Sequence, residues 1–310
     1  MIGGGPAGST AASMAAKSGL TVKICERSKF PREHVGESLL PASIAILEEL
    51  GLKEAISNAG FLPKYGATMV WGQDDTPWSW RFSETNKQNI HSYQVSRPIF
   101  DEILLKRSAE LGVLVEEESS VSKILTNDSN RGVVVTNKMG QEYFQPAKFI
   151  VDASGQSALL ARNLNLRQWD EHFQNLAIYG YFAGAKKLDA PDENNIFIES
   201  YENGWVWVIP LNDDTTSVGA VVDSNETNAK LRKTDPITFL KDQLSLTNRT
   251  SNMLSVAELK SDVKILKDWS YTTSKMAGDG WVLAGDAACF IDPLFSSGVH
   301  LAMMSGVLAS

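Results

Sequence analysis

The sequence predicts a mixed α/β (α+β) protein, in which a domain with a parallel sheet is joined to a domain with an antiparallel sheet. Three observations lead to this prediction. A glycine-rich turn followed by a helix of small residues stands at the start of the chain, strand–turn–helix units recur further along, and two runs between them alternate apolar with polar residues. Strand–turn–helix units are typical of parallel sheets, whereas alternation is typical of antiparallel strands with one face in water.

The composition indicates a globular protein and argues against several classes of partner. At 310 residues the chain can form one large domain or two ordinary ones. The net charge of -8 argues against nucleic acid and against a membrane surface, because both bind basic patches. No apolar run reaches the roughly 18 residues of a membrane span. Cys25 and Cys289 lack a metal-ligand spacing, so we expect reduced thiols, no metal site and a cytoplasmic protein.

The first thirty residues carry the pattern of a dinucleotide-binding turn. Gly3, Gly5 and Gly8 form G-x-G-x-x-G, and an alanine-rich helix and a strand over Thr21–Cys25 follow. Gly3 and Gly5 permit a tight turn and a close backbone approach to a pyrophosphate, and Gly8 lets helix and strand pack closely. Glu26, at the end of the strand, is placed to accept hydrogen bonds from a ribose. Three glycines alone are a weak signal, but this context favours a dinucleotide site over a simple turn.

The chain is expected to be an incomplete copy of a longer protein. Only Met1 and Ile2 precede the glycine turn, although the strand that feeds such a turn needs about five residues. That strand is central and buried in a parallel sheet. At the other end, Ser310 falls within a predicted helix.

The remaining elements complete the two sheets. Helical spacing of apolar residues, buried apolar runs and alternation identify them in turn. The predicted ranges are a helix over Pro98–Leu111, a strand from Val113, strands over Phe149–Ala153 and Trp281–Ala284, a helix beginning near Ser297, alternating strands over Ala177–Gly184 and Thr215–Asp223, and a polar loop over Asp223–Asp235.

Several of these features together resemble the flavoprotein monooxygenase superfamily. They are the glycine loop, Arg97 just ahead of its helix, the strand that ends in Asp152, and the pair Gly285–Asp286. The resemblance covers nearly the whole chain and implies a fold like that of para-hydroxybenzoate hydroxylase. It also implies an FAD-binding Rossmann-like domain over residues 1–62, 97–170 and 270–310, and a substrate domain with an antiparallel sheet over residues 63–96 and 171–269.

The resemblance implies FAD as the cofactor and assigns residues to its parts. Asp286 is expected at the ribityl chain, Arg97 near the pyrophosphate and Glu26 at the adenosine ribose. The backbone of Val121, in the strand-like stretch SVSKIL, is expected to contact adenine. The full set implied for the cofactor is Gly3, Gly5, Pro6, Ala7, Gly8, Glu26, Arg27, Arg97, Val121, Asp286 and Gly298.

Three further stretches are similar to the flavin-dependent halogenases. They are FPREHVGESLLP at residues 30–41, GFLPKYGA at residues 60–67, and a complete W-x-W-x-I-P signature at Trp205, Trp207, Ile209 and Pro210. Trp205 and Trp207 would share one face of a strand, where such residues more often fill a core. In this family, however, the tryptophans are thought to separate the flavin from the organic substrate, so that oxygen does not pass to it directly.

The family resemblance implies a halogenation reaction with two separate steps, one at the flavin and one at Lys64. FADH2, supplied by a separate flavin reductase, reacts with dioxygen and with bound chloride or bromide to give hypohalous acid. The acid travels to Lys64, which holds it or becomes a haloamine, and the halogen then passes to an electron-rich aromatic ring. The apolar neighbours Phe61 and Leu62 suggest a desolvated lysine with a lowered pKa, although most lysines lie at the surface.

Two residues of the turn FSSGVH are implied in halide binding. Ser297 and Gly298 would start a helix, where backbone N–H groups point outward at positive potential. A serine at this position is equally compatible with a plain helix cap, and only the resemblance favours a halide.

Phe295 departs from the tryptophan-specific halogenases. Those enzymes carry a glutamate just before the serine pair, whereas this chain has Phe295, as the phenol- and pyrrole-modifying branch does. A phenol or pyrrole feeds its own lone pair into the ring and needs less help from a carboxylate. We therefore expect a phenolic or pyrrolic substrate, free or tethered to a carrier protein. His34 and His300 are the nearest candidate bases for a phenol, but structural roles are more common, and neither is assigned to catalysis.

Three alternatives stay open at this point. A flavin-dependent aromatic hydroxylase of the same fold would take electrons directly from a nicotinamide cofactor and would not need Lys64. A reductase of isoprenoid chains shares the glycine loop and Gly285–Asp286 but not the tryptophan pair. A catalytically silent FAD-binding fragment is the third.

Overall fold

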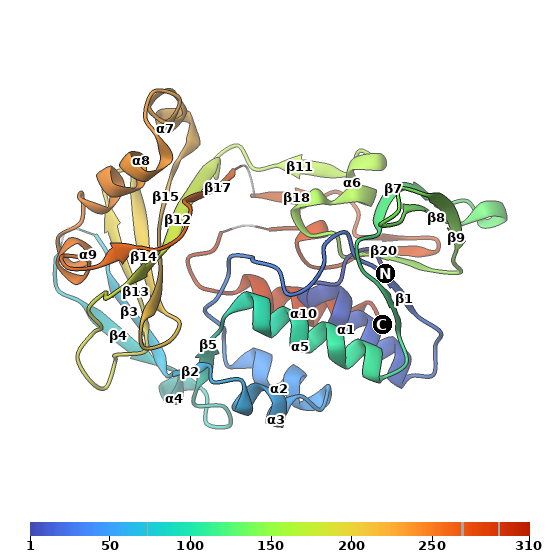
Figure 1. The fold of residues 1–310 in the computed structure, drawn as a ribbon, viewed down its shortest axis with the longest axis horizontal. Coiled ribbons are helices and arrows are strands. Elements are labelled where there is room, and N and C mark those ends of the chain that lie inside the picture. The colour runs from blue at the N-terminus through green and yellow to red at the C-terminus, as the bar shows by residue number, and fades with distance from the viewer. Residues whose placement is uncertain (73, 268–269, 291) are drawn as a thin grey trace.

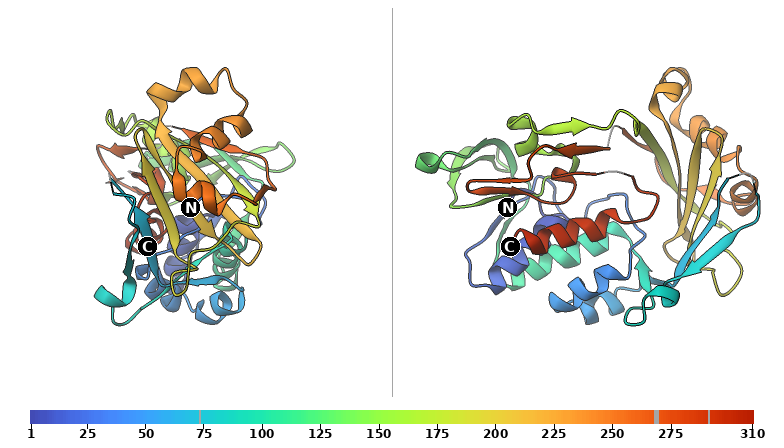
Figure 2. Two further views of the ribbon diagram at one scale, coloured as in Figure 1. Left: turned by 90° about the vertical axis from the view of Figure 1, so that its left-hand side faces the viewer. Right: turned by 180° about the vertical axis from the view of Figure 1, so that it is seen from behind.

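Two sheets, each flanked by helices, organise the chain (Figure 1). The computed structural model describes residues 1–310 except 73, 268, 269 and 291. A parallel sheet with three long helices forms one half, and a large twisted sheet forms the other. The two further views in Figure 2 show the same arrangement from the side and from behind. The predicted fold class is confirmed.

The parallel sheet brings together segments that are far apart in the sequence. Ile2 forms parallel bridges with both Cys25 and Asp152, so the residue before the glycine turn lies at the centre of the sheet. Both faces of the sheet are covered, and Ile24 and Val151 are fully buried. The strands in spatial order are β6 (Leu114–Glu116), β1 (Lys23–Cys25), β10 (Ile150–Asp152), β20 (Trp281–Leu283) and the antiparallel β19 (Ala277–Gly278), with Ile2 between β1 and β10.

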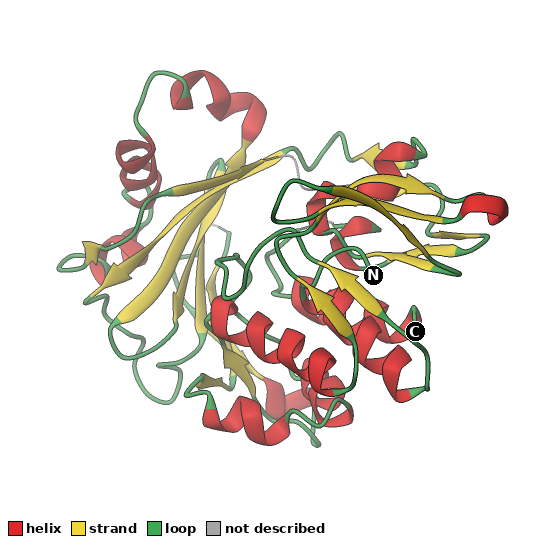
Figure 3. Cartoon of the chain, turned by 45° about the vertical axis from the view of Figure 1, so that its right-hand side comes forward, coloured by secondary structure: helices red, strands yellow, loops and turns green. Residues whose placement is uncertain are grey.

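Helices cover one face of the parallel sheet and a three-stranded meander covers the other (Figure 3). Small residues let two of the helices approach closely: a Cβ atom on Gly306 would lie 2.6 Å from the carbonyl oxygen of Ala7. The helices are α1 (Pro6–Lys17), α5 (Arg97–Glu110) and α10 (Gly298–Leu308), with α2 (Ala42–Glu49) and α3 (Lys53–Asn58) beside them. The meander and its neighbours are β7 (Ser120–Leu125), η1 (Asp128–Asn130), β8 (Gly132–Thr136), β9 (Glu142–Pro146), η2 (Gly155–Ser157), α6 (Leu159–Asn163) and η3 (Gly285–Ala287).

The large sheet is antiparallel except where β13 pairs with β3 in parallel. The expectation of one wet face for its central strands is wrong, because both faces of β12 and β15 are buried. Phe239 and Leu240 of α8 pack on one face, and the other face lies toward the parallel half. The strands in order are β16 (Glu258–Leu259), β12 (Asn175–Ala183), β15 (Thr215–Asp223), β14 (Gly204–Pro210), β13 (Ile196–Tyr201), β3 (Gly66–Val70) and β4 (Trp78–Arg81), with β17 (Lys264–Lys267) beside β12.

Short elements complete the structure. The polar stretch predicted as a loop contains α7 (Ser224–Leu231), whose Leu231 packs against the apolar core of the large sheet. The sequence of α7 is mostly polar and gives no periodic apolar signal, which is why the sequence pattern missed the helix. The others are α4 (Phe82–Thr85), α8 (Pro236–Leu244), α9 (Asn248–Met253), and the two-stranded pairs β2 (Leu62–Lys64) with β5 (Ser92–Gln94) and β11 (Arg167–Trp169) with β18 (Tyr271–Thr273). No helix in the described ranges is long and apolar enough to cross a bilayer.

Candidate functional site

A cavity of about 890 Å³ lies between the parallel sheet and the large sheet. Glu26 follows β1, residues 153–157 follow β10 and Asp286 follows β20, and all of them line the cavity. The carboxyl ends of parallel strands are where ligands bind in folds of this kind. The volume falls within the roughly 300–1,000 Å³ of small-molecule and cofactor sites.

The glycine turn forms one end of the cavity. Gly3 adopts φ +96°, and a Cβ atom there would lie 2.5 Å from the Ala153 carbonyl oxygen. A Cβ on Gly8 would lie 2.0 Å from the Gly3 carbonyl oxygen, so this glycine lets α1 pack against the turn and does not itself line the cavity. Because α1 begins at Pro6, its positive N-terminal end faces the cavity, as phosphate binding requires.

Glu26 and Arg27 continue the wall from the end of β1. The Glu26 carboxylate accepts hydrogen bonds from the backbone N–H groups of Gly4 at 2.7 Å and Ser28 at 2.8 Å. A carboxylate has about four acceptor positions, so Glu26 retains capacity for ribose hydroxyls. Arg27 donates to the Ser157 hydroxyl at 3.1 Å, which links the loop after β1 to the loop after β10.

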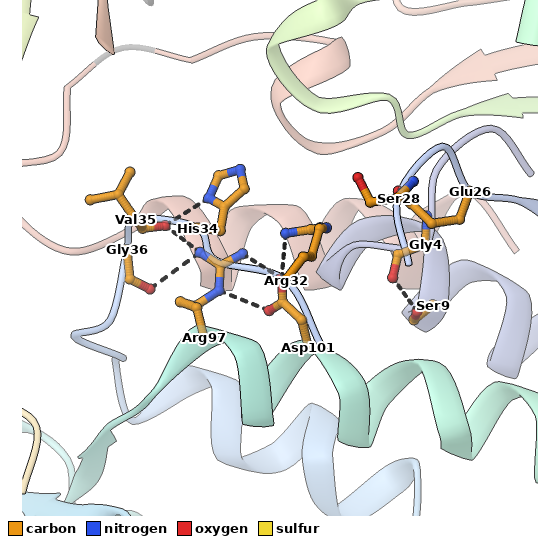
Figure 4. Close-up of polar contacts among 10 residues, drawn as sticks. All are labelled: Gly4, Ser9, Glu26, Ser28, Arg32, His34, Val35, Gly36, Arg97 and Asp101. Carbon is orange, nitrogen blue, oxygen red and sulfur yellow. Dashed lines mark hydrogen bonds and ion pairs between the residues drawn. The ribbon is translucent and has the colours of Figure 1, made fainter. Parts of the chain in front are cut away.

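Arg97 lies in the cavity wall, but protein atoms already occupy most of its donors (Figure 4). Its Nε and Nη2 donate to the two carboxylate oxygens of Asp101 at 2.8 and 2.9 Å. Its Nη1 donates to the carbonyl oxygens of Val35 and Gly36. Arg97 therefore fixes the segment that contains Val35, and less of its charge is left for a ligand than the sequence suggested.

Arg32 is a cavity residue that the sequence argument missed. Its guanidinium lies over the Phe30 ring, with the central carbon 4.6 Å from the ring centroid, and its Nη1 lies 3.3 Å from the Asp101 carboxylate. A Cβ atom built on Gly5 would lie 3.2 Å from Arg32 Nη2, so the positive charge stands directly beside the glycine turn. The residue belongs to FPREHVGESLLP, which the sequence argument used only as a family marker.

Asp286 lines the cavity from the turn that follows β20. Burial raises the pKa of its carboxyl to about 6, and nearby Arg97 opposes this shift. The backbone carbonyl of Asp286 accepts a hydrogen bond from the Tyr271 hydroxyl, and Gly285 N–H donates to the Ser305 hydroxyl at 2.6 Å. The turn after β20 is thus fixed, and the carboxylate is left available to hydroxyl groups of a ligand.

Glu37 and His34 also face the cavity from the segment after β1. Glu37 is buried, accepts a hydrogen bond from the Tyr181 hydroxyl at 3.0 Å, and has its pKa raised by burial. His34 is exposed on the cavity wall, where the surrounding protein and the charge of Arg97 lower the pKa of its ring to about 4, so the ring is neutral at pH 7. The His34 Nδ1 lies 2.9 Å from the Val35 carbonyl oxygen.

The turn assigned to the halide meets the cavity through three of its residues. Ser296, in the left-handed region at φ +57°, Gly298 and Val299 line the cavity, whereas Ser297 does not. Ser297 occupies the cap position of α10, yet its side chain makes no capping hydrogen bond. Phe295 is exposed, and His300 is half-buried with a pKa lowered by burial.

The tryptophan pair forms the wall between the cavity and the large sheet. Trp205 and Trp207 share a face of β14, are both buried, and have ring centroids 6.0 Å apart. Trp207 Nε1 donates to the Ser217 hydroxyl at 3.2 Å, which fixes the ring. Ile209 continues this face, whereas Pro210 lies on the opposite face of the strand and does not reach the cavity.

Lys64 is fully buried and lies outside the cavity wall. Only 1% of the residue is exposed, its Nζ donates to the Leu39 carbonyl oxygen at 3.1 Å, and the ammonium lies 5.3 Å from the centroid of the Phe82 ring. Burial lowers the pKa of Lys64 from 10.5 to about 7. Unlike most lysines, Lys64 is therefore not at the surface. A fraction of its amine is deprotonated at pH 7.

The structure brings most of the predicted residues to one cavity. Those that line it are Gly3, Gly5, Pro6, Ala7, Glu26, Arg27, Arg97, Val121, Trp205, Trp207, Ile209, Asp286 and Gly298. Gly8, Pro210, Ser297 and Lys64 do not line it. In the described part of the chain, no cluster of acidic, cysteine and histidine side chains could hold a metal ion.

Comparison with protein families and curated proteins gives consistent matches. The chain matches the family described as tryptophan halogenase over residues 1–91 and 85–308. It is 37% identical over 318 residues to a tryptophan 2-halogenase of Chondromyces crocatus, covering 100% of this chain and 59% of that protein. It is 36% identical over 338 residues to a chlorinase of 1H-pyrrole-2-carbonyl on a peptidyl-carrier protein from Pseudomonas fluorescens, covering 100% of this chain and 74% of that protein.

Solved structures show the same relationship. The FAD-dependent chondrochloren halogenase of a myxobacterium is 40% identical with a TM-score of 0.93, over 99% of this chain and 72% of that chain. The flavin-dependent halogenase CmlS is 40% identical with a TM-score of 0.94, over 99% of this chain and 56% of that chain. The chain thus spans little more than half the length of some of the proteins it matches.

Proposed function

Since the chain belongs to the flavin-dependent halogenase family, we propose that the full-length protein halogenates an electron-rich aromatic ring through Lys64. The observation that carries this proposal is the burial of the Lys64 amine, with a pKa near 7, behind a cavity that fits a flavin dinucleotide. A flavin hydroxylase has no need of such an amine.

The cavity residues fit FAD, the cofactor of this family. The glycine turn and the N-terminus of α1 would hold the pyrophosphate, with Arg32 beside them, and Glu26 would hold the adenosine ribose. Asp286 would accept from the ribityl hydroxyls. When bound in its reduced form, FAD supplies the electrons that, with dioxygen and chloride or bromide, yield hypohalous acid. We assign the halide to the turn at Ser297 and Gly298, of which Gly298 lines the cavity.

Lys64 supplies the second half of the reaction. The neutral amine attacks the halogen of hypohalous acid: an N–halogen bond forms, the oxygen–halogen bond breaks, and hydroxide leaves and takes one amine proton to become water. The protonated amine could only hold the acid by a hydrogen bond. A pKa near 7 keeps both forms populated at neutral pH, because a group is half protonated at its pKa.

Phe295 stands where the tryptophan-specific halogenases carry a glutamate, and this replacement supports a phenol or pyrrole as the substrate. The substrate would be either free or tethered to a carrier protein. The pyrrole-directed chlorinase and the tryptophan halogenase are 36% and 37% identical to the chain, so identity alone does not choose between their substrates. A separate flavin reductase would supply FADH2. We place the protein in the cytoplasm, which its two unpaired cysteines support. We also propose that residues 1–62, 97–170 and 270–310 form the FAD-binding domain and that residues 63–96 and 171–269 form the substrate domain.

The test supplies full-length protein with FADH2, dioxygen and bromide or chloride, and screens free and carrier-bound phenols, pyrroles and tryptophan by mass spectrometry for a halogen isotope pattern. Lys64→Ala should abolish the product while flavin binding and FADH2 oxidation persist. Lys123→Ala, which removes an exposed lysine, is the matched control. Rapid bleaching of oxidised flavin by NADPH alone, with a hydroxylated product, would instead establish a hydroxylase.

A further inference from the structure

A small three-stranded arrangement connects the cavity wall with Lys64. On one side β5 pairs with β2, the strand that ends in Lys64. On its other side, Leu39 N–H donates to the Tyr93 carbonyl at 3.0 Å, and Val95 N–H donates to the Glu37 carbonyl at 2.7 Å. β5 is therefore the middle strand, between the strand of Lys64 and a segment of the cavity wall.

The register places four polar side chains on one face of this arrangement. Lys64 is directly opposite Ser92, and Ser38 is directly opposite Gln94. Opposite residues of antiparallel strands share a face, as do residues two apart on one strand. Ser38, Gln94 and Ser92, which we call the polar stripe, therefore lie on the same face as the lysine side chain.

The polar stripe is buried and carries three unpaired polar atoms. Ser38 is 5% exposed, and Gln94 and Ser92 are 0% exposed. Among the described residues, none donates to or accepts from Ser38 Oγ, Gln94 Oε1 or Ser92 Oγ. A buried polar group that stays unsatisfied is unfavourable, and most buried polar side-chain atoms in native proteins have a hydrogen-bond partner. The concentration of these three unpaired atoms on one face indicates a path for a small polar guest.

The stripe is continuous with the cavity at one end and with the lysine at the other. Ser38 is itself a cavity-lining residue. At the far end, the Lys64 side chain passes over β5 and donates to the carbonyl of Leu39, the residue next to Ser38. The Gln94 amide between them is held by donation from its Nε2 to the Asn194 carbonyl at 3.0 Å.

We propose that the polar stripe Ser38–Gln94–Ser92 guides hypohalous acid from the flavin cavity to the Lys64 amine. This inference rests on the proposed halogenase function and names residues for the passage that this function requires. Hypohalous acid is small and neutral, donates one hydrogen bond and accepts others, as a hydroxyl group does. Alcohols and amides react with hypohalous acid far more slowly than thiols, thioethers and amines do. The acid would therefore pass along the stripe without reacting with its side chains.

The experiment separates production of the oxidant from its delivery. Full-length Ser92→Val and Gln94→Leu variants are supplied with FADH2, dioxygen and bromide. Bromination of phloroglucinol in the presence of excess methionine, a thioether that consumes acid in solution, measures delivery through the site, and bromination of monochlorodimedone in parallel reactions without methionine measures acid that escapes. We expect FADH2 oxidation to stay within twofold of wild type, the ring product to fall at least tenfold, and the escaped acid to rise. Ser92→Thr, which keeps a hydroxyl, should restore the ring product.

The matched control is Ser43→Val. Ser43 is also fully buried with an unpaired hydroxyl, but it lies on α2 and is not a member of the stripe. Its variant should keep the wild-type product ratio. Unchanged ring bromination in both stripe variants would overturn the inference while leaving the proposed function intact, and an equal loss in Ser43→Val would do the same. If wild-type protein brominates neither probe, the proposed function fails first. Should Ser92→Val not fold, Gln94→Leu and Ser92→Ala decide the question.

Discussion

Trp207 and Gly219 are directly opposite each other on β14 and β15, and the indole ring lies over the glycine. A Cβ atom on Gly219 would lie 2.4 Å from two carbons of the Trp207 ring and 2.6 Å from Tyr179 Cβ. Tyr179 pairs with Gly219 from the other side, and its ring centroid is 6.0 Å from that of Trp207. Because Gly219 has no side chain, Trp207 and Tyr179 can pack against each other over it and form the aromatic wall of the cavity.

The first prediction concerns this glycine. Gly219→Val should force Trp207 out of its position and lower the free energy of unfolding by about 1–3 kcal/mol, as overpacking does. Urea unfolding of flavin-free protein measures the change. The double variant with Trp207→Ala removes the obstructing ring, so it should lose clearly less stability than the sum of the two single variants. Strict additivity would show that the ring and the glycine are not coupled.

Local patterns were sufficient to predict the parallel half of the fold and the direction of the tryptophans. The glycine turn, α1 and β20 have strong signals within a few residues, and the alternation along β14 places Trp205 and Trp207 on one face. The same alternation places Pro210 on the face of β14 opposite to the cavity, although the family signature groups it with Trp205 and Trp207. The fold class and the family relationship are confirmed; the roles of single residues stay predictions.

The rest of the site depends on contacts between distant segments. The polar stripe exists only because residues 37–39 pair with β5 and β5 pairs with β2, and neither pairing leaves a trace in local periodicity. Arg32 was missed because its position beside Gly5 comes from the loop after β1 folding back over the turn. Elements far along the chain bury both faces of β12, so the alternation of this strand wrongly predicted one solvent-exposed face.

A second prediction tests Arg32 as the cation beside the pyrophosphate site. Arg32→Gln should weaken FAD binding about 10- to 100-fold, since a hydrogen bond to a charged group contributes about 1.5–3 kcal/mol. Riboflavin, which lacks phosphates, should bind both proteins alike. Titration followed by flavin fluorescence gives both affinities, with Lys29→Gln as a neighbouring control outside the cavity wall. An equal loss for FAD and riboflavin would mean that the variant damages the cavity in general.

The third prediction concerns Asp286, whose pKa of about 6 lies above its ordinary 3.8 because the carboxyl is buried. The folded protein then binds more protons than the unfolded chain between these values, so its stability falls as pH rises through this window. Asp286→Asn should therefore raise the Tm of flavin-free protein at pH 7 to 8, with no difference below about pH 4. FAD affinity should fall in the same variant. Unchanged FAD affinity would show that the carboxylate does not hold the cofactor.

The last prediction tests the burial of Lys64 without reference to catalysis. Its pKa of about 7, against 10.5 for an exposed lysine, means that the folded protein binds fewer protons than the unfolded chain between these values. Stability should consequently rise with pH from about 7 to 10, and Lys64→Met, which has no charge to bury, should exceed wild type in Tm by roughly 5 °C at pH 6 to 7. The difference should shrink toward pH 10. Lys123→Met, at an exposed position, should show no such trend. If Lys64→Met instead follows the wild-type pH profile, the amine carries no desolvation cost and its pKa is that of an ordinary lysine.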